Sequence, residues 1–196
     1  MKESDTKIKI LEAARSLFAQ QGFNGTSVKQ ICTQAGVNIS LISYYFGGKE
    51  QVLTELLNTS LFNIDIFKNN ELADDPVLGI REIVAGIINF RINNPEIMTI
   101  LHREILNQTP RNNQIESFIY PVWTRLRKYL ETGLETGLFE FPSVDHAFQL
   151  LVSVIIFPRI NPQFLKPLLS ADEYPAEGMI NNTMQFILRG LGYKLA

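Results

Sequence analysis

The stretch from Thr26 to Glu50 constrains the fold of this chain more than any other part of its sequence. Thr26 and Ser27 can cap a helix, because their side-chain oxygens accept the free N–H groups of a first helical turn. Apolar residues then follow at helical spacing, at Val28, Ile31, Cys32 and Ala35. Gly36 stands where a left-handed residue commonly ends such a helix. The pattern therefore predicts a short amphipathic helix that ends at Gly36.

A second short helix is predicted directly after this turn. Asn38 can cap it, and Ile39, Ile42 and Phe46 are expected to form its apolar face. Two helices joined by three or four residues that include a glycine, and packed through small apolar faces, describe a helix-turn-helix. The same periodicity also fits any helical hairpin of an all-α protein.

The outward face of the second helix favours DNA binding over a plain hairpin. It offers short hydroxyls, exposed aromatic rings and a nearby cation, which are groups that donate to phosphates and touch base edges. A face that needed only solubility would more often carry Glu and Lys. Gly47 and Gly48 leave free N–H groups at the start of the next helix, where a phosphate is favoured. The predicted DNA-binding residues are Thr26, Ser27, Asn38, Ser40, Leu41, Ser43, Tyr44, Tyr45 and Lys49.

These residues resemble the DNA-binding segment of the TetR family of bacterial transcriptional regulators. The family has a Thr-rich start, an Ala-Gly-Val turn, a recognition helix that ends Tyr-Tyr-Phe or similar, and a Lys-Glu pair. The matching elements are Thr26-Ser27, Ala35-Gly36-Val37, Tyr44-Tyr45-Phe46 and Lys49-Glu50, within a resemblance that covers residues 7–56. Ile39, Ser43 and Gly48 depart from residues frequent in relatives, so no operator sequence is implied. The NI..I.YYFG.KE pattern and the REIL…YP segment are similar to the CecR branch.

The remaining chain also predicts helices, which makes the fold class all-α. Residues 5–22 are predicted to form a first helix with its main apolar stripe at Ile8, Leu11, Ala14 and Phe18, widened by Ile10 and Leu17. Residues 1–50, here called the head, are thus a three-helix DNA-binding domain. A long connector helix is expected at 49–69, followed by a polar linker at 70–75. Residues 51–196, which include most of the connector, are the predicted ligand-binding and dimerisation domain. Its helices are expected at 76–93, from Pro95 to near Pro110, at 113–136 through Pro121, at 144–157 and at 175–191.

The resemblance implies that the chain forms a homodimer through its last two long helices, at about 144–157 and 175–191. The sequence AFQLLVSVIIF in the first of these is apolar nearly all round, which is unusual for a surface helix of a monomer. The alternative is a central core helix of a monomeric helical bundle.

Aromatic residues in the C-terminal domain suggest an apolar pocket for an unidentified small-molecule effector. His102, Arg103 and Glu104 are the best source of polar contacts in an otherwise apolar helix, although they equally fit an outward face. Aromatic residues at helical spacing are more often core than ligand contacts, so the alternative is plain packing. The predicted ligand-binding residues are Phe62, Phe90, His102, Phe118 and Trp123, with no cofactor and no metal.

Charge and composition limit the classes of protein that the sequence can represent. The formal net charge is −2, but residues 1–53 carry six Lys or Arg against four acidic residues (+2), and the remainder carries 12 against 16 (−4). This small asymmetry has the sign expected for a DNA-binding head. The polar N-terminus predicts no signal peptide, and no apolar run is long enough to span a membrane. The single cysteine, Cys32, fits a cytoplasmic protein in which it packs as a small hydrophobe.

These observations favour a cytoplasmic, homodimeric DNA-binding transcriptional regulator that represses from a near-palindromic operator and is released by a ligand. An enzyme is disfavoured, because the chain has no nucleophile elbow, no CxxC or HExxH motif, and only two histidines far apart. The alternative that stays open is a helical protein-interaction module without specific DNA binding.

Overall fold

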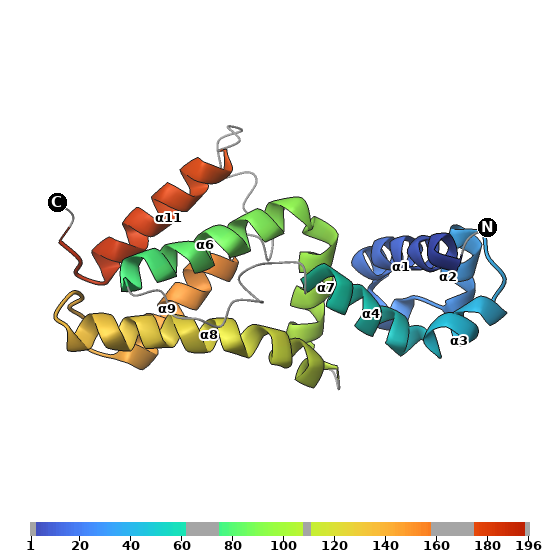
Figure 1. Ribbon diagram of the computed structural model, residues 1–196, viewed down its shortest axis with the longest axis horizontal. Helices are drawn as coiled ribbons and strands as arrows, with labels where there is room; N and C mark the ends of the chain where they lie inside the picture. The colour runs from blue at the N-terminus through green and yellow to red at the C-terminus, as the bar shows by residue number, and fades with distance from the viewer. Residues whose placement is uncertain (1–2, 62–74, 108–110, 158–174, 195–196) are drawn as a thin grey trace. The chain divides into compact units, whose positions relative to one another are not determined.

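The computed structural model describes residues 3–61, 75–107, 111–157 and 175–194 (Figure 1). Regular secondary structure in these ranges is helical throughout, which confirms the all-α prediction. None of the helices described there is long and apolar enough to cross a lipid bilayer. Phe62, the connector helix beyond Leu61, most of the polar linker and the proline-rich segment after Phe157 lie outside the described residues.

The chain divides into two compact units. Unit 1 comprises Met1–Asn63 and Asn94–Glu116, and unit 2 comprises Ile64–Asn93 and Ser117–Ala196. Unit 1 is larger than the predicted head, because α4 and α7 both pack against α1. The boundary predicted at residue 50 divides the chain by function, and that division stays a prediction.

Unit 1 is built around α1 (Glu3–Gly25), against which α2 (Val28–Ala35), α4 (Lys49–Leu61) and α7 (Pro95–Leu106) pack. The short helix α3 (Ser40–Phe46) packs against α4. Gly22 interrupts α1 with φ +77°, a left-handed conformation that glycine adopts without steric cost. The first helix therefore breaks at the residue where the sequence predicts its end.

The buried stripe of α1 differs from the predicted one. Ile10, Ala14 and Phe18 are fully buried, but the side chain of Ile8 is 50% exposed. The prediction for Ile8 was wrong because successive helical residues are rotated by about 100°, so Ile8 lies about 200° around the helix from Ile10. Thr6 occupies the buried face in its place.

Unit 2 contains α6 (Pro76–Asn93), α9 (Val144–Ile156), α11 (Ala176–Gly190) and most of α8 (Asn112–Glu135). These bounds agree with the predicted ones within about two residues, and α8 continues through Pro121 as predicted. All four helices contribute to one apolar core. Its fully or almost fully buried members include Ile80, Val84, Leu126, Leu130, Ile155 and Ile187.

Gly79 of α6 lies against the ring of Tyr129 of α8. A Cβ atom at this position would overlap the ring of Tyr129, which is itself buried. We expect Gly79→Ala to lower the free energy of unfolding by about 1–3 kcal/mol, because overpacking outweighs the better helix propensity of alanine.

Gly190→Ala is the matched control, since no atom lies within 4 Å of the added methyl group there. Its free energy of unfolding should stay at or slightly above that of the wild type. Urea unfolding followed by circular dichroism measures both variants. Equal destabilisation of the two would contradict the close packing at Gly79.

Candidate nucleic-acid interface

Helix α2 is stabilised at both ends by the residues that the sequence indicates. Ser27 is the N-cap: its Oγ accepts from the backbone N–H of Gln30 at 3.2 Å, while its own N–H donates to Gln30 Oε1 at 2.8 Å. This reciprocal pair is a capping box. Gly36, with φ +66°, ends the helix, and Ile31 and Cys32 are buried. Burial raises the pKa of the Cys32 thiol, which agrees with a packing role.

Thr26 and Lys49 have partners within the protein. The hydroxyl of Thr26, which is almost fully buried, donates to Gly22 O at 2.8 Å. The Nζ of Lys49 donates to Phe23 O at 2.9 Å and to Thr26 O at 2.7 Å. Burial and the nearby Arg111 guanidinium lower the pKa of Lys49. The phosphate contacts predicted for these two residues stay predictions, and the structure gives both a second role in fixing the loop between α1 and α2.

The outward face of α3 combines hydroxyls with an aromatic ring. Ser40 and Ser43 are exposed, Tyr44 is 77% exposed, and Leu41 and Tyr45 are half-buried. The rings of Tyr44 and Tyr45 meet edge to face, with centroids 5.0 Å apart. These side chains can present donors and acceptors to the base edges of a major groove.

The start of α3 differs from the predicted one. Asn38 Oδ1 accepts from the backbone N–H of Ser40 at 3.0 Å and from its Oγ at 2.8 Å, but the N-cap of the helix is Ile39, which has no side-chain capping bond. Ile39 was expected on the buried face but is 55% exposed. It occupies the N-cap position, one residue before the helix begins.

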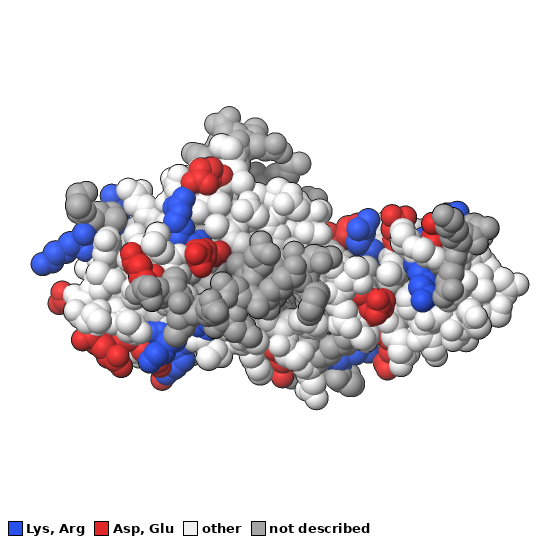
Figure 2. Space-filling model, viewed as in Figure 1, with Lys and Arg blue, Asp and Glu red and all other residues white. Residues whose placement is uncertain are grey.

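The surface around α3 has little charge. In Figure 2, basic and acidic side chains alternate over the visible face, and the region of α3 is drawn largely white. The helix itself, SLISYYF, contains no charged residue. Lys7 of α1 is a cation close to α3, with its Nζ 5.5 Å from the centroid of the Tyr45 ring. Short-range polar contacts must therefore carry more of any DNA affinity than a basic surface does.

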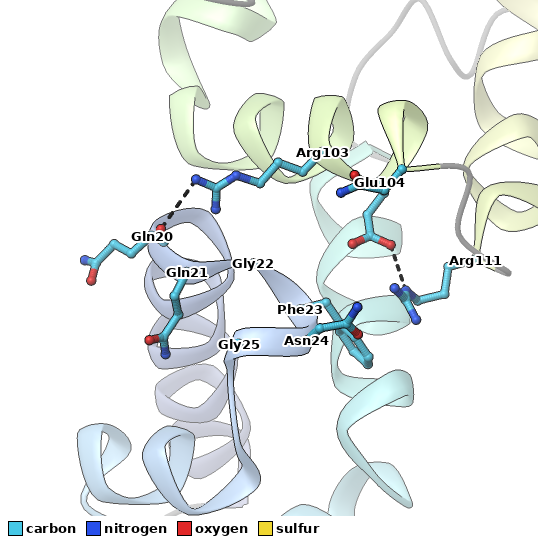
Figure 3. A pocket seen from close by; sticks show the side chains of 10 residues that line it. Gln20, Gln21, Gly22, Phe23, Asn24, Gly25, Arg103, Glu104 and Arg111 are labelled. Carbon is cyan, nitrogen blue, oxygen red and sulfur yellow. Dashed lines mark hydrogen bonds and ion pairs between the residues drawn. The ribbon is translucent and has the colours of Figure 1, made fainter.

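Two arginines outside the head contact it, and the sequence did not predict this. Arg103 of α7 donates from Nη1 to Ala19 O at 2.8 Å, at the end of α1. Arg111 donates from Nε to Glu104 Oε2 at 2.7 Å, and its Cζ lies 4.0 Å from the centroid of the Phe23 ring (Figure 3). The sequence left Arg103 and Glu104 either as polar contacts of a ligand or on an outward face, and in the structure they lie at the end of α1. The sequence feature that indicated a polar contact was this pair of charges in an otherwise apolar helix. The sequence alone did not show which side of the helix the pair lies on.

The predicted ligand-binding residues are divided between the two units. Phe90 is buried in α6, and Phe118 and Trp123 are half-buried on α8, all in unit 2. The ring of Trp123 packs edge-on against Phe148 at 6.4 Å. His102 is half-buried on α7 in unit 1. The pocket therefore stays a prediction.

Comparisons with known proteins agree with this geometry. Residues 10–56, which extend from α1 into α4, match the family model described as bacterial regulatory proteins, tetR family. The chain is 32% identical over 173 residues to the HTH-type transcriptional repressor NicS of Pseudomonas putida, covering 85% of this chain and 82% of that protein. The chain belongs to the TetR family of bacterial regulatory proteins. It is therefore a DNA-binding transcriptional regulator and not an enzyme.

Solved structures resemble this TetR-family regulator over nearly its whole length. HlyIIR, a hemolysin II transcriptional regulator, is 28% identical with a TM-score of 0.71, covering 92% of this chain and 98% of that one. FadR from Bacillus subtilis, solved with stearoyl-CoA, has a TM-score of 0.70 at 18% identity, covering 93% and 98%, and shows the shared fold alone. The similarity to the CecR branch stays a prediction.

The internal contacts of Lys49 predict an effect on stability. We expect Lys49→Gln to lower the free energy of unfolding by about 1.5–3 kcal/mol, because two carbonyl groups lose a charged donor. Lys29→Gln, an exposed position on α2, is the control and should be nearly neutral. Thermal and urea unfolding check both. If the two variants are equally stable, the contacts of Lys49 do not form in solution.

Proposed function

We propose that this regulator represses transcription in the cytoplasm by binding a near-palindromic operator as a homodimer, and leaves the DNA when a small ligand binds its C-terminal domain. The observation that carries the proposal is the exposed polar and aromatic face of α3, on a helix-turn-helix held by capping and by α4. Each α3 enters a major groove of one half-site.

Base reading is assigned to Ser40, Leu41 and Ser43. Both serine hydroxyls are exposed and can donate or accept, and Leu41 can contact a thymine methyl group. Tyr44 and Tyr45 supply contacts to the backbone, and the N-terminus of α2 at Ser27 offers its dipole to a phosphate. Because α3 has no charge, the slope of affinity against salt should be modest.

The apolar surface of α9 and α11 supports the homodimer. A groove of about 430 Å³ lies on this surface and is lined by residues of both helices, including Leu150, Val154 and Phe186. Leu150 is 54% exposed and Phe186 is 67% exposed in the single chain. A contiguous apolar surface of this kind marks a protein contact, and a second copy of the same surface satisfies it with two-fold symmetry. The monomeric bundle would leave these side chains in water.

We propose a small-molecule effector because a protein with the same fold binds a ligand. The structure of FadR with stearoyl-CoA supports a ligand site in this fold, without naming the ligand of the present chain. Phe90, Phe118 and Trp123 remain the candidate aromatic contacts. The ligand must prefer the conformation that does not bind DNA, because only differential affinity shifts the population.

DNA binding by α3 can be tested on a fragment from upstream of the gene that encodes this chain. We expect Tyr44→Ala to weaken binding about tenfold, to this fragment and to unrelated DNA alike, because a hydrogen bond to a charged phosphate is worth about 1.5–3 kcal/mol and a backbone contact does not depend on sequence. Tyr120→Ala, which also removes an exposed tyrosine but from α8, should bind like the wild type. Fluorescence anisotropy over a salt series measures both. Wild-type binding that does not distinguish this fragment from unrelated DNA would favour the helical interaction module instead.

The dimer can be tested by placing a charge on its proposed surface. We expect Phe186→Glu to convert a dimer into a monomer at micromolar concentration, since a carboxylate would be buried in an apolar contact. Leu78→Glu, on an exposed apolar residue of α6, should leave the dimer intact. Sedimentation velocity gives the masses. A monomeric wild type would contradict the dimer.

A further inference from the structure

We propose that Arg111 is a positioning residue for DNA binding, which fixes the loop from Gly22 to Thr26 and hence the orientation of α2 and α3. The proposal rests on the DNA-binding function given above. Arg111 lies outside the head and outside the 10–56 range that matches the family. It belongs to the same compact unit as the head.

Arg111 is held from three directions. Its guanidinium Cζ lies 4.0 Å from the centroid of the Phe23 ring, close enough for a cation–π interaction. Its Nε donates to Glu104 Oε2 at 2.7 Å, and its Nη1 lies 3.6 Å from Glu50 Oε1. The side chains of Arg111 and Glu104 are only 15% and 6% exposed. A planar guanidinium with these partners has little freedom to turn, so it defines where the Phe23 ring sits.

Phe23 transmits this restraint to the backbone of the loop. Its ring also lies under Lys49 Nζ at 4.1 Å, and the same ammonium group donates to Phe23 O and Thr26 O. The N–H of Thr26 donates to Phe23 O at 3.2 Å, which closes a tight turn. Ser27, the next residue, is the N-cap of α2. A displacement of Phe23 therefore shifts the first turn of α2, and α3 follows α2 after one short turn.

Arg103 adds a second restraint from the same segment. Its Nη1 donates to the carbonyls of Phe18 and Ala19 at 3.3 and 2.8 Å, and its Nη2 donates to Gln20 O at 3.4 Å. These carbonyls lie in the last turn before Gly22, where a helix has no internal donors left and the dipole favours a cation. Figure 3 shows Arg103 and the Glu104–Arg111 pair reaching the end of α1 from the same side. Arg103 and Arg111 thus hold the two sides of the Gly22 break.

A charge-neutral double variant separates positioning from direct phosphate contact. Arg111→Gln with Glu104→Gln removes the pair without leaving a buried carboxylate unpaired. The matched control is Arg81→Gln with Glu177→Gln, which removes a surface pair of unit 2 at 2.6 Å. Binding is measured to the gene's own upstream fragment and to unrelated DNA of equal length, from low to high salt.

We expect the Arg111 and Glu104 variant to lose specific affinity about tenfold, equivalent to one well-made base contact, with non-specific affinity and salt slope unchanged. The control pair should bind like the wild type. Specific affinity within about twofold of the wild type would overturn the proposal. A salt slope reduced by about one would also overturn it, because Arg111 would then be contacting a phosphate itself.

Two further measurements keep the proposal testable if the double variant unfolds or if no DNA binds. Arg111→Lys keeps the charge but not the planar fork, and should lose several-fold in specific affinity; unchanged affinity overturns the proposal. Hydrogen exchange without DNA should be faster at the amides of residues 23–30 in the Arg111 variants than in the wild type. Unchanged exchange would contradict the positioning role, whereas failure of the wild type to bind DNA would contradict only the proposed function.

Discussion

The loop from Gly22 to Thr26 is the point on which the DNA-binding part of this regulator depends. Gly22 breaks α1 with a left-handed conformation, and the Phe23 ring then packs beneath two cations, Lys49 and Arg111. Both charges are satisfied, Lys49 by backbone carbonyls and Arg111 by Glu104. Burying cations is costly unless such partners exist. The cluster therefore has few alternative arrangements, and a single geometry of the helix-turn-helix follows.

The sequence was sufficient for the features that local chemistry determines. The capping box at Ser27, the left-handed Gly36 and the start of α6 at Pro76 each arise within a few residues. Features set by tertiary contacts were less accessible. No sequence rule indicates that Lys49 donates to the carbonyls of Phe23 and Thr26, and its phosphate contact stays a prediction. The sequence also left the side of the helix on which Arg103 lies open, because the carbonyls that it contacts are 83–85 residues away. Ile8 and Ile39 were misplaced because apolar character alone does not give the rotation of a helix or its first residue.

The head of this regulator carries little net charge, and its helix α3 carries none. A head with a net charge of +2 and an uncharged α3 attracts DNA of any sequence only weakly. Specific affinity must then come from short contacts that tolerate little displacement. In the proposed function, the charged groups that fix the loop between α1 and α2 limit such displacement, and two heads on one dimer raise the affinity.

The central claim is that two copies of α3 read two half-sites on one face of the duplex. Hydroxyl-radical footprinting of the wild-type protein on its gene's upstream DNA tests this most directly. We predict two protected tracts related by approximate two-fold symmetry, with centres about 10–10.5 base pairs or a multiple of that distance apart. A single tract, or uniform protection that appears only at saturating protein, would contradict the claim.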